Sequence, residues 1–206
     1  MLLDEPLVNL DYKLREELRE ELGLLFAQGR STVVYATTEP GEALLLGGYT
    51  AVMDAGELLQ YGPTAEVFHR PNSIRVAKAF SDPPMNLWPA HRAEQGVRLH
   101  TGLVCPVALP AQVQAECTVG IRASALRLQA RPGDLSLHGQ VELSEVSGSD
   151  TYVHTRTEVG NVVLQIPGIH TLQLDAHIDV FFSPDQLYVF DDAGALLKAP
   201  AWKGRA

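Results

Sequence analysis

A pair of prolines divides this chain into two stretches with different hydrophobic patterns. Before Pro83 and Pro84, leucines at helical spacing alternate with short β-branched runs; after them, short apolar runs are separated by Gly, Pro and Asp. Tandem prolines stiffen the backbone and remove amide donors, which suits a linker better than a helix or a strand. The sequence therefore predicts two domains, residues 1–82 and 83–206, with a linker near residues 81–89.

The first stretch has the pattern of an α/β layer. Asp11 can cap a helix whose apolar stripe is formed by leucines at helical spacing, namely Leu14, Leu18, Leu22 and Leu25. Residues 32–37 are short, apolar and β-branched, as is typical of a buried parallel strand. A helix is expected at 40–46 and strands at 49–54 and 57–61. Thr64 and Ser73 are each expected to cap a short helix. The earlier strands of such a layer are absent, so open edges and apolar surface are expected.

The second stretch has the pattern of an all-β domain. Residues 141–146 alternate apolar and polar side chains, as a half-buried strand does. Short strands at this spacing favour a small barrel or sandwich. The strands are expected at 97–104, 117–122, 138–146, 150–157, 161–166, 177–183 and 186–190. The expected fold class is α+β: the end of an α/β domain followed by an all-β barrel.

Composition excludes several classes of protein. The net charge of −9 argues against a nucleic-acid surface, which needs a concentrated positive field. Cys105 and Cys117 lack a Cys-x-x-Cys spacing, so neither a zinc site nor a disulfide framework is indicated. No apolar run approaches the length of a membrane-spanning helix, and we find no signal peptide. A cytoplasmic chain is expected, with any membrane association made through partners.

Two acidic residues at the start of the chain carry the clearest chemistry. Asp4 and Glu5 follow the apolar pair Leu2-Leu3. Phosphoryl transfer to water uses such a pair, one carboxylate holding the water shell of a magnesium ion and the other orienting the attacking water. A Gly-x-x-x-x-Gly-Lys-Ser/Thr loop, which would cradle the phosphates, does not occur in the sequence. The pattern is that of the second half of an ATPase site.

Five segments in order resemble one family. They are Leu2 to Pro6 (Walker B with its catalytic glutamate), Asn9-Leu10-Asp11 (D-loop), Thr32 to Ala43 (strand and H-loop), Val52 to Leu58, and Gln60 to Val67. Residues 2–87 thus resemble the C-terminal part of the ATPase domain of ABC transporters of the maltose-type importer group. Val8 departs from the pattern, because a small hydroxyl residue is usual there.

The H-loop carries a second departure. Thr38 stands where the family has its switch histidine, and Glu39 replaces the usual aspartate. A threonine hydroxyl can bond a phosphate oxygen but cannot carry positive charge or reach as far as imidazole. Two readings stay open. In the first, the substitution matters, and either the hydrolytic site is weakened or the subunit works beside a competent partner. In the second, Thr38 is tolerated because Glu5 supplies most of the catalysis.

The resemblance continues into the second stretch. Val119 to Arg122 resembles the family's Gly-Ile-Arg-Pro strand, with Ala123 in place of proline; Ser147 to His154 and Phe181 to Phe190 resemble later signatures. Together they imply the OB-like (TOBE) accessory domain, which in relatives mediates subunit pairing and sometimes binds regulators. Inert packing on the ATPase domain is the alternative. Arg122 is expected to brace the barrel through a carboxylate, with anion binding as the other reading, and Trp88 and Trp202 to anchor linker and tail.

The resemblance implies an energy-coupling subunit of an importer for a sugar, polyol or glycerol-type solute. In the full-length protein ATP and Mg²⁺ would be bound, with Glu5 as catalytic base, Asp4 holding magnesium through water, Asp11 communicating across a dimer, and Thr38 at the H-loop position. Partners would be transmembrane permease subunits and a second ATPase subunit, identical or not, at the cytoplasmic face of the membrane. This chain alone is expected to be inactive and to bind neither cofactor. A non-catalytic regulatory or dimerisation module is the alternative, and an OB-type oligonucleotide binder is disfavoured by the acidic charge and by the lack of a basic, aromatic groove.

Overall fold

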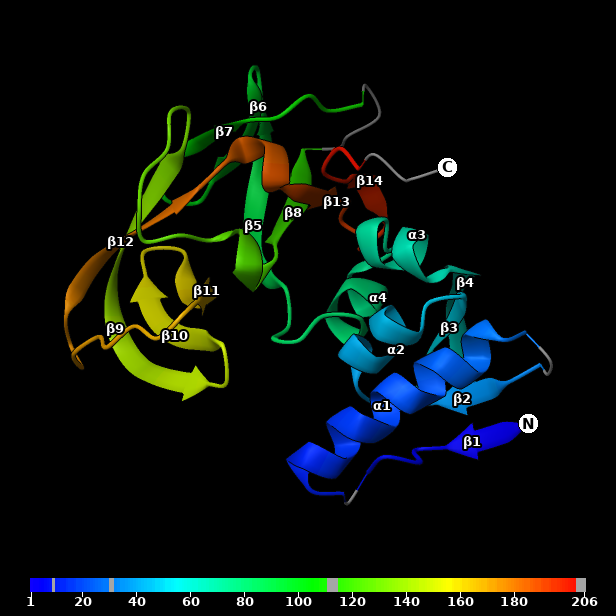
Figure 1. Cartoon of the computed structure of the whole chain (residues 1–206). Coiled ribbons are helices and arrows are strands. Elements are labelled where there is room, and N and C mark those ends of the chain that lie inside the picture. The colour runs from blue at the N-terminus through cyan, green and yellow to red at the C-terminus, as the bar shows by residue number, and fades with distance from the viewer. Residues whose placement is uncertain (9, 30–31, 111–114, 203–206) are drawn as a thin grey trace.

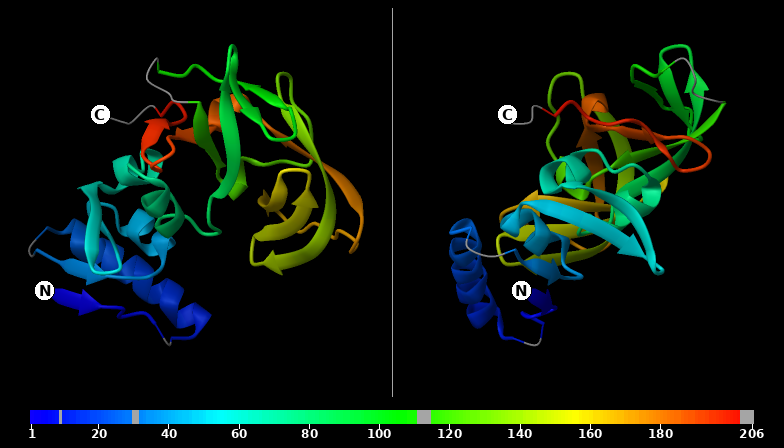
Figure 2. Two further views of the ribbon diagram at one scale, coloured as in Figure 1. Left: turned by 180° about the vertical axis from the view of Figure 1, so that it is seen from behind. Right: turned by 90° about the vertical axis from the view of Figure 1, so that its right-hand side faces the viewer.

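The helices are gathered at one end of the chain. The computed structural model describes residues 1–8, 10–29, 32–110 and 115–202, and in these residues all four α-helices lie before residue 80 (Figure 1). We call residues 1–79 the N-terminal part and residues 86–198 the β part. Figure 2 shows that α1 (Tyr12–Ala27) lies on the side of the N-terminal part remote from β13 (Tyr188–Phe190) and β14 (Leu196–Lys198). The chain is mostly β with few helices, and no helix in the described residues is long and apolar enough to cross a membrane.

Among its described residues, the N-terminal part has two small sheets and four helices. A two-stranded parallel sheet pairs β1 with β2, and an antiparallel hairpin pairs β3 with β4 around a turn at Ala55-Gly56. Five of the elements expected from the sequence are confirmed in type: the helix behind Asp11, the helix at 40–46, and the strands at 32–37, 49–54 and 57–61. The elements are β1 Leu2–Asp4, α1 Tyr12–Ala27, β2 Val34–Ala36, α2 Pro40–Leu46, β3 Tyr49–Asp54, β4 Glu57–Pro63, α3 Thr64–His69 and α4 Ile74–Ala79.

Side-chain caps explain where two of these helices begin. The Asp11 carboxylate accepts the amide of Leu14 at 3.0 Å, and the Ser73 hydroxyl accepts the amide of Val76 at 3.4 Å. The cap expected at Thr64 is wrong, because Pro63 occupies the cap position. The Thr64 hydroxyl instead donates to the Gly47 carbonyl at 3.0 Å, tying α3 to the end of α2.

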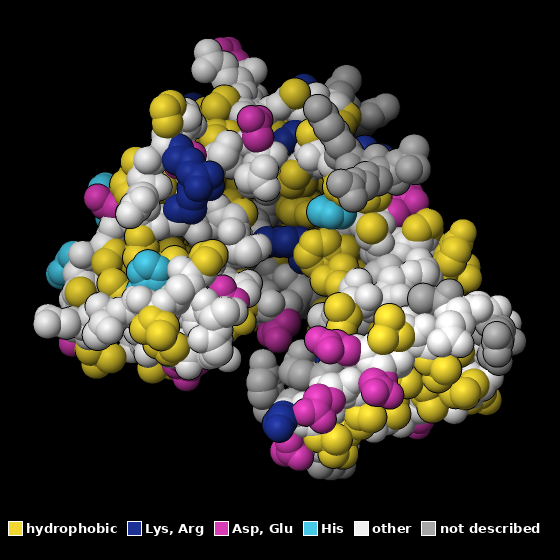
Figure 3. Space-filling model, viewed as in Figure 1, with side chains coloured by type: hydrophobic (Ala, Val, Ile, Leu, Met, Phe, Trp, Pro, Cys, Tyr) yellow, Lys and Arg dark blue, Asp and Glu magenta, His cyan; other side chains and the backbone are white. Residues whose placement is uncertain are grey.

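Apolar surface remains open on the N-terminal part, as the sequence led us to expect. Each strand of the β1–β2 sheet has one neighbour, and Leu2 and Val34 are 82% and 58% exposed. The α1 stripe is not buried either, since Leu25 is 50% exposed. Tyr49 and Tyr61 stack on the open face of the β3–β4 hairpin, with ring centroids 5.7 Å apart. Figure 3 shows hydrophobic side chains spread over this region, at the lower right.

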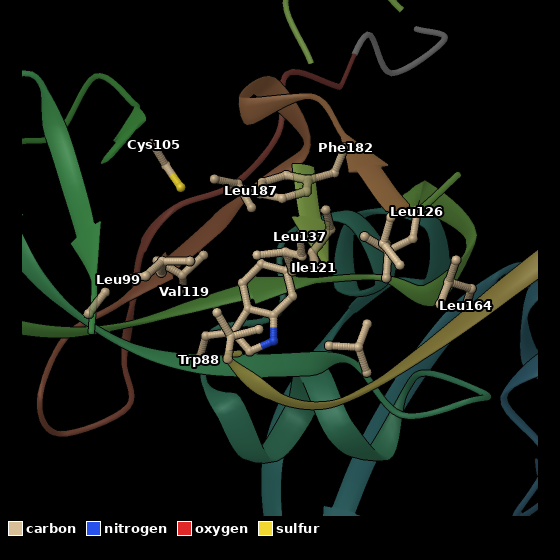
Figure 4. Close-up of a cluster of buried hydrophobic side chains, with 14 of the residues drawn as sticks. Trp88, Leu99, Cys105, Val119, Ile121, Leu126, Leu137, Leu164, Phe182 and Leu187 are labelled. Atoms are coloured by element: carbon tan, nitrogen blue, oxygen red, sulfur yellow. The ribbon is translucent and has the colours of Figure 1, made fainter. Parts of the chain in front are cut away.

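The β part consists of two sheets around one core. The four-stranded sheet has the order β11-β10-β9-β12, and the six-stranded sheet has the order β14-β13-β8-β5-β6-β7. Buried side chains from both sheets meet between them, among them Trp88, Ile121, Leu137, Leu164, Phe182 and Leu187 (Figure 4). The strands are β5 Asn86–Ala93, β6 Gly96–Leu99, β7 Val104–Pro106, β8 Glu116–Ile121, β9 Leu135–Ser147, β10 Asp150–Thr157, β11 Gly160–Pro167, β12 His177–Phe182, β13 Tyr188–Phe190 and β14 Leu196–Lys198.

Two sequence expectations fail in the β part. The single strand expected at 97–104 is two strands, β6 and β7, separated by a turn in which Gly102 takes a positive φ of 92°. The linker expected near residues 81–89 is shorter, because β5 begins at Asn86. Pro89 is compatible with a strand here, since β5 pairs only with β8 at that position and β6 joins from Ala90 onward.

The two parts share a small core of their own. Ala77 of α4 and Met85 pack with Tyr188 and Phe190 of β13, and all four are buried. Backbone hydrogen bonds join the parts as well: the Ile74 amide donates to Gly194, and the Leu196 amide donates to Asn72, each at 2.9 Å. The N-terminal part is therefore packed directly against the β part by α4 and the segment just before it.

Candidate functional site

The acidic pair lies at the carboxyl end of β1. Asp4 is paired in register with Ala36 of β2, and the Glu5 amide donates to the Ala36 carbonyl at 2.9 Å. Both side chains are exposed, and Glu5 has a positive φ of 43°, which is uncommon for a residue other than glycine. The chain turns sharply at Glu5, so its carboxylate projects from the strand end.

Thr38 lies at the same edge. It follows β2 by two residues, and because β1 and β2 run parallel, their carboxyl ends meet on one side of the sheet. The Thr38 side chain is exposed. The structure thus brings Asp4, Glu5 and Thr38 to neighbouring strand ends, although 33 positions separate Glu5 from Thr38 in the sequence.

A network of buried polar groups holds the residues beside Thr38. Glu42 of α2 is 5% exposed and accepts hydrogen bonds from the Thr37 hydroxyl at 2.6 Å and the Tyr35 hydroxyl at 3.0 Å. Burial, followed by the bond to Glu42, raises the pKa of Tyr35. The Glu39 amide donates to the Thr37 hydroxyl at 3.0 Å. Both neighbours of Thr38 are therefore fixed, while Thr38 itself points to solvent.

Asp11 has a structural role in addition to the one expected from the resemblance. Its carboxylate caps α1 by accepting the Leu14 amide. The residue is exposed, and the cap uses one of its two oxygens, Oδ1. Asn9, the first residue of the D-loop-like segment, lies outside the described residues.

The strand ends that carry Asp4, Glu5 and Thr38 offer ligands for a hard cation but no loop that would bind phosphate. Carboxylate oxygens are the ligands that Mg²⁺ prefers, and Asp4 offers an exposed one. In the described part of the chain, no cluster of three or more His, Cys, Asp or Glu residues is arranged to bind a metal by itself. Two cavities of about 450 and 440 Å³ flank the β5–β6 turn, and none of the candidate residues lines them.

Arg122 forms a second polar centre, at the junction of the two parts. It follows β8, and its guanidinium donates to the carbonyls of Phe68 and Phe80 and to the Ser81 hydroxyl. The same group lies 3.7 Å from the centre of the Phe68 ring, a cation–π contact. The prediction that Arg122 pairs with a carboxylate is wrong, because its main acceptors are carbonyls at and beyond the ends of α3 and α4, where helices accept hydrogen bonds from cations.

The two tryptophans occupy different environments. Trp88 is 1% exposed and belongs to the core of the β part rather than to a linker. Trp202 stacks on His69 of α3, with ring centroids 4.8 Å apart, so it does anchor the segment behind β14. Sequence reasoning missed the junction partners Phe68, His69 and Tyr188, because nothing in their local pattern distinguishes them from ordinary core residues.

Comparison with known proteins identifies one domain and relatives along most of the chain. Residues 119–190 match the model of the TOBE domain. The chain is 37% identical over 197 residues to the sn-glycerol-3-phosphate import ATP-binding protein UgpC 3 of Rhizobium etli, covering 92% of this chain and 53% of that protein. It is 33% identical over 207 residues to the xylose/arabinose import ATP-binding protein XacK of Haloferax volcanii, covering 96% of this chain and 54% of that protein.

A solved structure of the cytoplasmic molybdate-binding protein ModG aligns with 50% of this chain and 94% of its own, with a TM-score of 0.42 and 15% identity. The chain spans about half the length of the curated relatives that it matches. By sequence, the chain matches the C-terminal portion of ABC importer ATP-binding proteins of the maltose-type group, including the TOBE domain.

Proposed function

We propose that this chain acts as the C-terminal portion of the ATP-binding, energy-coupling subunit of an importer for a sugar, polyol or glycerol-type solute. One observation carries the proposal: an exposed acidic pair and the H-loop position lie together at the ends of two parallel strands. The relatives that support it are named as import ATP-binding proteins for glycerol phosphate and for pentoses.

Each candidate residue has a role in this proposal. Glu5 is the general base, which orients water for attack on the γ-phosphate, and Asp4 holds Mg²⁺ through a water molecule. Mg²⁺, when bound, neutralises charge that develops on the phosphates. Thr38 donates a hydrogen bond to a phosphate oxygen, and Asp11 communicates with a second ATPase subunit across a dimer.

The site needs a phosphate-binding part that this sequence does not contain. Such a part would supply the glycine-rich loop and would cover the apolar surface around Leu2, Val34 and Tyr49. Closure of two subunits around ATP would then drive permease subunits, to which the protein attaches at the cytoplasmic face of the membrane. Nucleic acid is not a partner in this proposal, given the net charge of −9.

The test is a chimera. The C-terminal half of the Rhizobium etli relative is replaced by this chain, and steady-state hydrolysis of Mg-ATP is measured. Glu5→Gln should nearly abolish turnover and trap an ATP-bound closed dimer, while Glu142→Gln on the β part serves as the control. Turnover that survives Glu5→Gln unchanged would rule out Glu5 as the base.

Thr38→His in the same chimera separates the two readings of the H-loop. Hydrolysis should rise if the site is limited by the missing imidazole. Unchanged hydrolysis with intact nucleotide binding would favour a threonine that is simply tolerated.

A non-catalytic pairing or regulatory module is the second candidate. The direct packing of α4 on β13 favours it, because the N-terminal part would then support the β part without any nucleotide. Sedimentation of the chain alone distinguishes the two: the module should form a dimer at micromolar concentration without ATP, whereas the first candidate requires no such dimer.

A further inference from the structure

One side chain reaches the loops behind both parallel strands. Arg15, in the second turn of α1, donates through Nη1 to the Glu39 carboxylate at 3.0 Å and through Nη2 to the Leu10 carbonyl at 3.3 Å. Leu10 lies in the loop that connects β1 to α1, and Glu39 lies in the loop that connects β2 to α2. Arg15 therefore bridges the segment before Asp11 and the segment after Thr38.

A second arginine of the same helix strengthens one end of this bridge. Arg19 donates to the other oxygen of Glu39 at 2.6 Å and to Glu42 at 3.2 Å. The two oxygens of Glu39 are thus divided between two guanidinium groups one helical turn apart. Glu42 in turn accepts from Thr37, so α1, Glu39 and the Thr37 hydroxyl form one connected network.

The network is partly shielded from solvent. The Arg15 and Arg19 side chains are 28% and 18% exposed and that of Glu42 is 6% exposed, while the Glu39 side chain is 42% exposed. Partly buried ion pairs with good geometry are weakened by salt much less than surface pairs are. The guanidinium plane also fixes the direction of its donors, which an ammonium group does not.

We infer that Arg15 is a positioning residue that couples the loop of Asp11 to the loop of Thr38, so that a displacement of either loop is transmitted to the other. The inference rests on the proposed function in so far as these are the loops that would face nucleotide. The coupling itself is a property of this chain without nucleotide. Glu39, which stands where relatives of this type usually have aspartate, is the group on which the bridge ends.

A purely structural role makes a different prediction. If Arg15 simply stabilised α1, then Arg15→Lys would change amide exchange in both loops or in neither, in proportion to its effect on the melting temperature. The three donors of a lysine radiate from one nitrogen, so lysine cannot span the Glu39 carboxylate and the Leu10 carbonyl as the two Nη groups of Arg15 do. A coupling role therefore predicts that Arg15→Lys preserves the melting temperature and breaks the communication between the loops.

The experiment is residue-resolved amide exchange by NMR on the full 206-residue chain without nucleotide. Two amides are followed: Leu14, bonded to the Asp11 carboxylate, and Glu39, bonded to the Thr37 hydroxyl. Glu39→Gln should speed exchange of the Leu14 amide about tenfold, the scale of losing one charge-assisted bond in a local opening. In an Arg15→Lys background, Glu39→Gln should leave the Leu14 amide unchanged.

The matched control is Arg75→Gln. Arg75 also bridges two carboxylates, Asp54 and Glu57, and a backbone carbonyl, but it does so on the β3–β4 hairpin. It should leave both amides unchanged. The inference is overturned if Glu39→Gln does not alter the Leu14 amide, or alters it equally in the Arg15→Lys background. Because no nucleotide is present, neither result depends on whether the chain takes part in hydrolysis.

Discussion

Replacing Arg122 with glutamine should separate the unfolding of the helices from that of the β part. Arg122 leaves the end of β8 and donates to Phe68, Phe80 and Ser81 of the N-terminal part and its connection. Glutamine keeps the polarity and much of the length of the side chain. It lacks the charge and the fork of donors, so it cannot satisfy all three acceptors at once.

The expected loss can be worked from these contacts. A hydrogen bond to a charged group contributes about 1.5–3 kcal/mol, and a partly desolvated cation–π contact about 1–2 kcal/mol. The contacts share one guanidinium and are not additive, and glutamine retains one bond, so the net loss should be about 3 kcal/mol. That is a substantial fraction of the roughly 5–15 kcal/mol of stability typical of a domain.

Denaturant unfolding with two probes tests this prediction. In a Trp202→Phe background, fluorescence reports Trp88 in the core of the β part, while the helical circular dichroism signal reports α1 to α4. The transitions should coincide when Arg122 is present and separate in the Arg122→Gln variant, with the helical signal lost first.

The control for this experiment is Arg127→Gln, because the Arg127 side chain bonds Ala125 and Asp134 within the β part. It should shift the midpoint of the β part without separating the helical transition ahead of it. Coincident, unshifted transitions in Arg122→Gln would refute the claim that this residue joins the two parts.

Three further outcomes are expected. Burial raises the pKa of the Cys105 thiol to about 12, so it should react with a disulfide reagent at neutral pH only after unfolding; rapid reaction of the native protein would count against the buried position. Gly139→Ala should lower stability by about 1–3 kcal/mol in thermal unfolding, because the new Cβ would lie 2.3 Å from a threonine methyl of β10, whereas Gly41→Ala, which meets nothing within 4 Å, should be harmless. Burial and then the charge of Arg122 lower the pKa of His69, so the contribution of His69 to stability is present above the unfolded pKa of about 6.5 and is lost as pH falls below it. His69→Gln should therefore flatten the decline in unfolding free energy between about pH 7 and 5. An unchanged slope would exclude this group.

Elements with local signals could be predicted from the sequence. The caps at Asp11 and Ser73 and the turn at Gly56, where φ is 80°, depend on residues within a few positions of one another. The shared location of Glu5 and Thr38 was expected only from the family resemblance, and the parallel pairing of β1 with β2 supplies the structural reason for it.

Features set by tertiary neighbours could not be predicted. The linker predicted from Pro83 and Pro84 was expected to extend to residue 89, whereas β5 begins at Asn86 and accommodates Pro89 where it pairs with β8 and before β6 joins. The partners of Arg122 are mainly backbone carbonyls, which are present at every residue and leave no mark in the sequence. The bridge made by Arg15 could not be predicted for the same reason, since one of its two acceptors is the backbone carbonyl of Leu10.

The central claim is that this chain holds the acidic edge of an ATPase site and not its phosphate cradle. A calorimetric titration of Mg-ATP into the 206-residue chain tests it most directly. The account predicts no saturable heat of binding. Saturable binding near micromolar affinity, about −8 kcal/mol, would contradict it, because the chain would then contain a phosphate site of its own.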